Sequence, residues 1–133
     1  MAKVTGRPVT VTVDDVLGTP TDITNDVTSV TFSTPQGTQD VTGLDKTAIE
    51  RMLLLADCTV TLGGVFNSAL SHAVLATTCV SSVARTTAIA LAGPVTLTAE
   101  LIFADYTVSR PGDGSLSWSA TGSLSSGTAA AWT

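Results

Sequence analysis

The segment Val95 to Phe103 places the strongest constraint on the fold, because its polarity alternates from one residue to the next. One parity is apolar and the other polar: Val95, Leu97, Ala99, Leu101 and Phe103 alternate with Thr96, Thr98 and Glu100. Since the side chains of a β-strand point to opposite faces in turn, this segment is predicted to be a strand with one buried and one polar face.

A reversal of the chain is predicted directly after this strand, at Arg110 to Gly114. Proline presets the backbone φ there, and the glycines tolerate positive φ. Beyond the turn, Leu116, Trp118 and Ala120 alternate with serine and threonine, which predicts a second strand paired with the first. The sequence therefore predicts a long antiparallel hairpin, against which the preceding segments pack.

The composition favours an all-β fold. Apolar residues make up 44% of the chain and charged residues only 13%, so threonine and serine supply most of the polar surface. Threonine suits a pleated, half-buried surface. A chain of 133 residues suits one domain, which we expect to span residues 1–133.

Further strands are predicted where valine alternates with threonine or serine, and one helix is predicted to flank them. The strands are expected at residues 8–16, 27–34, 58–65 and 86–91, with a turn or bulge at 35–37. A helix is expected at residues 67–78, where apolar residues recur at three- and four-residue steps. The predicted architecture is all-β with one flanking helix, as two packed antiparallel sheets in a sandwich or barrel.

Local signals conflict between residues 40 and 56. Thr47 and Glu50 have the spacing of a capping box, and Ile49, Met52 and Leu53 follow at helical spacing, which predicts a short helix. Such a helix of about two turns is too short to be stable alone, so tertiary context decides its conformation.

The charge balance argues against a protein that grips nucleic acid. The net charge is −5, and only six lysine and arginine residues are present to neutralise phosphates. This does not exclude a protein past which DNA slides. We expect no signal peptide and no transmembrane helix, so the chain is expected to stay soluble in the cytosol, with Cys58 and Cys79 as small buried thiols.

Catalytic signals are weak, and no catalytic residue, cofactor or metal site is predicted. His72 is the only histidine; it is more simply a solvated or packing residue than a general base. No Gly-x-Ser-x-Gly motif surrounds a serine. Glu100 and Asp105 are expected on a solvated strand face rather than in a glycosidase dyad. The protein is therefore expected not to be an enzyme.

The order of segments resembles the tail tube (major tail) proteins of long non-contractile-tailed bacteriophages. The resemblance covers most of residues 26–132 and is carried by residues 39–42, 55–67, 71–75, 114–124 and 129–132. The stretch Lys46 to Leu54 departs from the pattern, since such proteins usually carry an extended loop where this sequence has a capping box.

The resemblance implies six-subunit rings that stack into a tube, with strands of neighbouring subunits joined in a barrel around a lumen. It also implies a virion tail location after assembly in the host cytoplasm, with a tape measure protein and other tail proteins as partners and with DNA passing without specific binding. No membrane partner and no cofactor is implied. An inter-subunit loop is expected at Asp45, Lys46, Glu50 and Arg51.

The lumen wall is expected to be polar but not basic, because a basic wall would hold DNA at many points. On this reasoning the channel-facing residues are predicted to be Thr96, Thr98, Glu100, Ser117 and Ser119. The strand Val27 to Thr34 also has a polar side and is the alternative wall.

Two other functions compete with this interpretation. A capsid decoration protein, or another virion accessory protein, would share the threonine-rich β composition. A carbohydrate-binding sandwich would need a row of exposed aromatic side chains, and Trp118 and Trp132 are too few and too far apart for that. An enzyme is the least favoured class.

Overall fold

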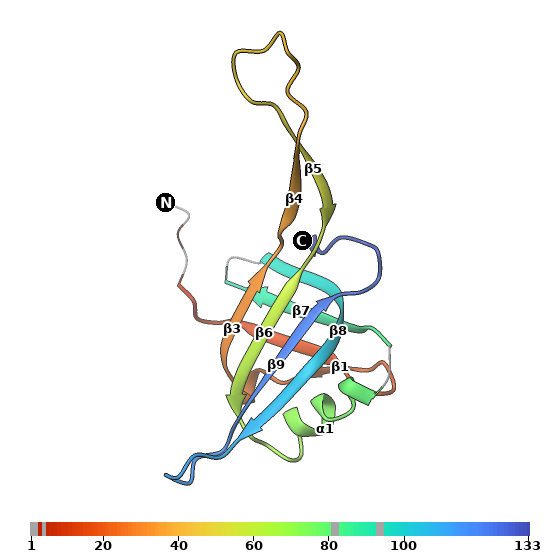
Figure 1. Ribbon diagram of the computed structural model, residues 1–133. Coiled ribbons are helices and arrows are strands. Elements are labelled where there is room, and N and C mark those ends of the chain that lie inside the picture. The colour runs from red at the N-terminus through yellow and green to blue at the C-terminus, as the bar shows by residue number, and fades with distance from the viewer. Residues whose placement is uncertain (1–2, 4, 81–82, 93–94) are drawn as a thin grey trace.

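The computed structural model describes residues 3, 5–80, 83–92 and 95–133, and β-strands dominate it (Figure 1). Its main sheet is antiparallel, with the strand order β2-β1-β7-β8-β9-β6-β3. These strands are β1 (Thr10–Asp14), β2 (Pro20–Asp22), β3 (Val27–Ser33), β6 (Thr59–Val65), β7 (Arg85–Leu91), β8 (Val95–Ser109) and β9 (Ser117–Leu124). The short strand β10 (Ala131–Trp132) pairs with the first half of β8.

The long strand β8 divides the main sheet into two layers. Its first half, Val95 to Leu101, pairs with β7, and its second half, Leu101 to Ser109, pairs with β9. The register shifts between Phe103 and Asp105, and such a bulge bends the strand that carries it. Figure 1 shows β8 passing from a layer with β7 and β1 into a layer with β9, β6 and β3. We call these the first and the second layer.

The hydrophobic core lies between the two layers and confirms the predicted strand faces. In the apolar parity of β8 and β9, Leu97, Leu101 and Trp118 are at most 3% exposed, whereas Val95, at the start of β8, is exposed. The first layer adds the core residues Val11, Val13 and Ile89, and the second adds Val60, Leu62 and Ala120. The two outer faces of the layers therefore point in opposite directions. The predicted antiparallel pairing of the two strands that flank the turn is also confirmed.

The flanking helix is shorter than predicted. α1 spans only Ser71–Leu75, and a separate 3₁₀ turn, η2, spans Thr78–Val80. The hydroxyl of Thr77 donates to the carbonyl oxygen of Val74 at 2.8 Å, and that of Thr78 donates to the carbonyl oxygen of Leu75 at 2.7 Å. Such local bonds compete with continued helix.

A buried carboxylate from another segment anchors the start of α1. Asp26 lies at the end of the 3₁₀ turn η1 (Thr24–Asp26) and is 4% exposed. It accepts hydrogen bonds from the backbone N–H of Ser71 at 3.1 Å and from the side-chain amide of Asn67 at 3.2 Å. A free N–H at the helix start is thus satisfied by a side chain distant in sequence.

The predicted helix around Thr47 is wrong, and of the turn or bulge predicted at residues 35–37 the structure has the bulge, as a register shift between Gln36 and Thr38. The chain instead forms a two-stranded hairpin of β4 (Gln36–Asp40) and β5 (Arg51–Ala56), with residues 41–50 as its tip. We call residues 36–56 the arm. It projects from the end of the second layer (Figure 1). A two-turn helix there would have no apolar surface to pack on, whereas pairing with β4 satisfies the backbone of β5.

Among the described residues, no helix has both the length and the apolar character needed to cross a membrane.

Candidate assembly surfaces

Hydroxyl side chains make up most of the outer face of the second layer, which also includes Gly63 and the exposed Val65 of β6. Alternate residues of its four strands point away from the buried Val60, Leu62, Trp118 and Ala120. The hydroxyl residues on this face are Ser29, Thr31 and Ser33 of β3, Thr59 and Thr61 of β6, Ser117, Ser119, Thr121 and Ser123 of β9, and Thr107 and Ser109 of β8. We call this surface the hydroxyl face.

The strand register brings these residues together across the sheet. One continuous row runs Thr31, Thr61, Thr121 and Asp105, from β3 through β6 and β9 to β8. Directly opposed residues in an antiparallel sheet lie about 4.5–5.5 Å apart. The hydroxyl groups therefore form one contiguous polar surface rather than isolated sites.

Asp105 is the one charged residue on the hydroxyl face, and it accepts a hydrogen bond from the hydroxyl of Thr107 at 2.9 Å. No lysine or arginine occupies the outward positions of these four strands. Such a surface is hydrated and offers no cation to a phosphate backbone.

The second layer has a free strand at each side. Within the described part of the chain, β3 pairs only with β6, and residues 105–109 of β8 pair only with β9. Unpaired backbone N–H and C=O groups at such edges are ready to pair with another chain. The hydroxyl face is thus bounded on both sides by edges that can extend the sheet.

The five residues predicted to face a lumen do not share one surface. Ser117 and Ser119 lie on the hydroxyl face, together with the polar side of β3, which the sequence offered as an alternative wall. Thr96, Thr98 and Glu100 lie on the outer face of the first layer, which points the opposite way. The hydroxyl of Thr86 donates to the Glu100 carboxylate there.

The tip of the arm and the adjoining first residue of β5 carry the residues predicted to form an inter-subunit loop. Asp45, Lys46, Glu50 and Arg51 are all exposed, and the ammonium of Lys46 lies 3.5 Å from the carboxylate of Glu50. Arg51 stands opposite Asp40 in the hairpin. Hydrogen bonds from the hydroxyl and backbone N–H of Thr42 hold the pKa of Asp40 below its ordinary value.

The arm also exposes large apolar side chains, which the sequence reasoning missed. Leu55 is 92% exposed and Leu53 is 63% exposed, and Met52 and Leu54 are also exposed. The available signal was the unbroken apolar run from Met52 to Leu55. A strand with apolar residues at consecutive positions is typical of burial on both faces, and here neither face is covered.

His72 occupies a packing position. Its ring Nδ1 lies 3.0 Å from the hydroxyl of Tyr106, and its ring centroid is 4.9 Å from that of Phe66. Burial raises the pKa of Tyr106. Both cysteines are free thiols, but only Cys58 is buried as predicted; the prediction is wrong for Cys79, which is exposed. Burial, followed by the charge of Asp57, raises the pKa of Cys58.

No known protein-family model matches the chain, and no curated protein matches its sequence. Solved structures do match in fold. A chain in the tail of an empty gene transfer agent particle, a structure with C6 symmetry, superimposes with a TM-score of 0.81 at 15% identity and covers 98% of this chain and 99% of that one. A chain in the virion of a native gene transfer agent particle gives a TM-score of 0.80 at 15% identity over the same shares. The chain therefore has the fold of these particle subunits over its whole length.

Proposed function

We propose that this protein is a structural subunit of a phage-like virion tail, in which rings of six copies stack into a tube. The observation that carries the proposal is the full-length fold similarity to a chain of a tail with C6 symmetry. The surfaces of this chain agree with it, because a polar face without lysine or arginine lies between two strand edges that can pair with further copies.

A ring forms when the free edge of β3 in one subunit pairs with the free edge of β8, at residues 105–109, in the next. The two edges are different surfaces of one chain, so their contact is head-to-tail, and such a contact closes into a ring when the rotation allows it. Closing the ring also removes every free edge of the second layer, which a monomer would leave open to aggregation.

The hydroxyl face then lines the lumen. Duplex DNA carries about one negative charge per 1.7 Å of its axis, so each lysine or arginine on the wall would add an attractive contact that slows its passage. Serine and threonine keep the wall wet without holding phosphates. On this proposal Ser117 and Ser119 face the channel, whereas Thr96, Thr98 and Glu100 face away from it.

The arm provides contacts beyond the barrel seam. Its charged tip, at Asp45, Lys46, Glu50 and Arg51, contacts neighbouring subunits, and other tail proteins, including a tape measure protein within the lumen, complete the particle. The subunit works by shape and assembly, without a catalytic step, and is incorporated into the virion tail after assembly in the host cytoplasm.

Electron microscopy of the concentrated purified protein tests the proposal. Stacked rings with six-fold symmetry and an open axial channel are expected. Free monomers at every concentration, or trimers that bind only to capsids as a decoration protein would, contradict it. A ring variant with Ser117→Lys and Ser119→Lys is expected to assemble but to retain DNA in a salt-dependent manner, whereas Thr96→Lys with Thr98→Lys serves as the matched control without retention.

A further inference from the structure

The arm exposes apolar side chains on both faces, although its own chain gives it nothing to pack against. The register sets Leu53 opposite Thr38 and Met52 opposite Gln39, so these two side chains point to opposite faces, and the exposed Leu54 and Leu55 follow at a shift in the register. Within the described residues, β4 and β5 pair only with each other. An exposed apolar patch of this kind marks an interaction surface.

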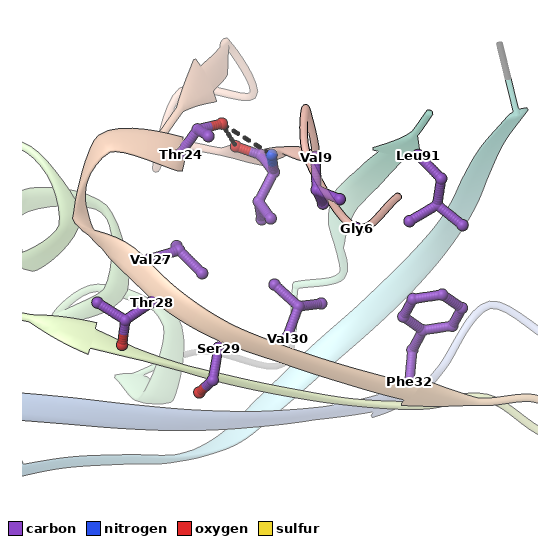
Figure 2. Close-up of a pocket in the computed structure, with 10 residues that line it drawn as sticks. Gly6, Val9, Thr24, Val27, Thr28, Ser29, Val30, Phe32 and Leu91 are labelled. Atoms are coloured by element: carbon purple, nitrogen blue, oxygen red, sulfur yellow. Dashed lines mark hydrogen bonds between the residues drawn. The ribbon is translucent and has the colours of Figure 1, made fainter. Parts of the chain in front are cut away.

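The same chain carries an apolar gap of about 400 Å³ between its two layers, on the side where β3 and β1 are not hydrogen-bonded to each other (Figure 2). Six apolar residues line it: Val9, Val11, Val27, Val30, Phe32 and Leu91. Figure 2 shows Val30, Phe32 and Leu91 converging on this space. The volume lies within the range of about 300–1,000 Å³ that holds drug-sized molecules, so it can take more than one leucine side chain.

The lining of the gap suits the apolar side chains of the arm and does not suit a charged group. None of the residues that line the gap is charged, and its polar members are Thr24, Thr28 and Ser29. The hydroxyl of Thr24 is already occupied, because it accepts a hydrogen bond from the backbone N–H of Val11 at 2.9 Å. The segment Met52 to Ala56 is likewise uncharged.

An arm cannot enter the gap of its own subunit. Only Thr34 and Pro35 connect β3 to β4, and only Asp57 and Cys58 connect β5 to β6, so the arm continues the direction of the second layer. Figure 1 shows it extending beyond the end of that layer. At the end of β3 from which the arm emerges, the subunit's own tail is already in place, with the ring of Trp132 centred 5.8 Å from that of Phe32.

We propose that the apolar segment Met52 to Leu55 of one subunit packs into the apolar gap beneath β3 of a second copy of this chain. The inference rests on the proposed ring assembly and adds to it a second contact, separate from the edge pairing of β3 and β8. Each copy contributes one arm and one gap, so a closed or stacked assembly of identical copies satisfies both everywhere. A different protein in the gap would leave the arms uncovered.

Cross-linking between differently labelled copies tests this contact. In a Cys79→Ser background, one copy carries Leu53→Cys and the other Thr28→Cys, at exposed positions on the arm and beside the gap. The two are co-assembled from monomers and treated with a short bis-maleimide. A covalent dimer is expected from the mixture and not from either variant alone. The matched control replaces Thr28→Cys by Ser119→Cys on the hydroxyl face, and it is expected to give no dimer.

The outcomes separate this inference from the proposed function. Tubes that form without the Leu53–Thr28 dimer overturn the arm contact and leave the tail function standing. Dimers without tubes support the arm contact and contradict the tail function, and the absence of both overturns both. Independently, Leu55→Asp is expected to raise the protein concentration needed for assembly about tenfold or more, with an unchanged melting temperature of the monomer. An unchanged assembly threshold would overturn the contact.

Discussion

Replacing Trp118 by alanine tests the assignment of the two faces of the hairpin. The side chain is 3% exposed, its indole N–H donates to the carbonyl oxygen of Val65 at 2.9 Å, and its ring lies 6.3 Å from that of Tyr106. A buried tryptophan hides about 150–250 Å², which at ~25 cal/mol per Å² corresponds to about 4–6 kcal/mol. An alanine side chain retains part of this buried area, so Trp118→Ala is expected to lower the free energy of unfolding by about 3–5 kcal/mol.

Urea unfolding of the dilute monomer, followed by far-ultraviolet circular dichroism, measures this loss. Since small domains are stable by only about 5–15 kcal/mol, the variant should be barely folded at ambient temperature. Trp118→Phe keeps most of the buried area and should lose about 1–2 kcal/mol, mainly through the lost hydrogen bond. Trp132→Ala is the matched control, because that ring is 49% exposed. A loss below about 1 kcal/mol for Trp118→Ala would show that the apolar parity of β9 does not face the core.

Three further perturbations have defined outcomes. Gly64→Ala should prevent folding, because the added Cβ would collide with the backbone carbonyl oxygen of Asp26 at the end of η1. Gly112→Ala is the control and should fold normally, because no atom lies within 4 Å of the position of its added Cβ. Solubility and melting temperature distinguish the two variants. Hydrogen bonds from Thr24 lower the pKa of Asp22 from 3.8, so the stabilisation from this carboxylate is present above pH 3.8 and is lost as the pH falls through the lowered pKa. The amount by which Asp22→Asn lowers the melting temperature should therefore shrink between pH 7 and about pH 2. A difference in melting temperature that stays constant over this range would refute the prediction. The assembly defect of Leu55→Asp should not be reproduced by Leu17→Asp, which alters an equally exposed leucine outside the arm.

The strands could be predicted because their signal is local. Alternation in Val95 to Phe103 and in Val27 to Ser33 reports directly which side of each strand is buried, and the structure has the same faces. The bend of β8 could not be predicted in this way. At the bulge between Phe103 and Asp105, the outward positions of β8 change from even-numbered to odd-numbered residues as the strand passes into the second layer. The stretch from Phe103 to Asp105 contains no glycine or proline, the residues that usually signal a break in a strand. Local alternation therefore predicts a common surface for Thr98 and Ser119, although they lie on opposite ones.

In the arm, the local sequence signal for a helix is real, but no apolar surface is available for such a helix to pack against. Thr47 and Glu50 have helix-capping spacing, but helical stability in proteins comes mainly from packing an apolar face. Around residues 41–50 the chain supplies no such surface, so the cross-strand partner of β5 decides the conformation. The run Met52 to Leu55 carried more information than the capping box, because consecutive apolar residues indicate a segment covered on both sides, which a single subunit does not provide.

The most direct test of the central claim is the accessibility of the hydroxyl face in the assembled particle. In a Cys79→Ser background, Ser119→Cys and Thr98→Cys are compared for reaction with a small maleimide and with a maleimide attached to a protein too large to enter the channel. In monomers both cysteines should react with both reagents. In tubes, the cysteine at position 119 should react with the small reagent but not with the large one, while the cysteine at position 98 should not show this selective exclusion. Equal reaction of the cysteine at position 119 with the large reagent before and after assembly would contradict a lumen wall built from the hydroxyl face.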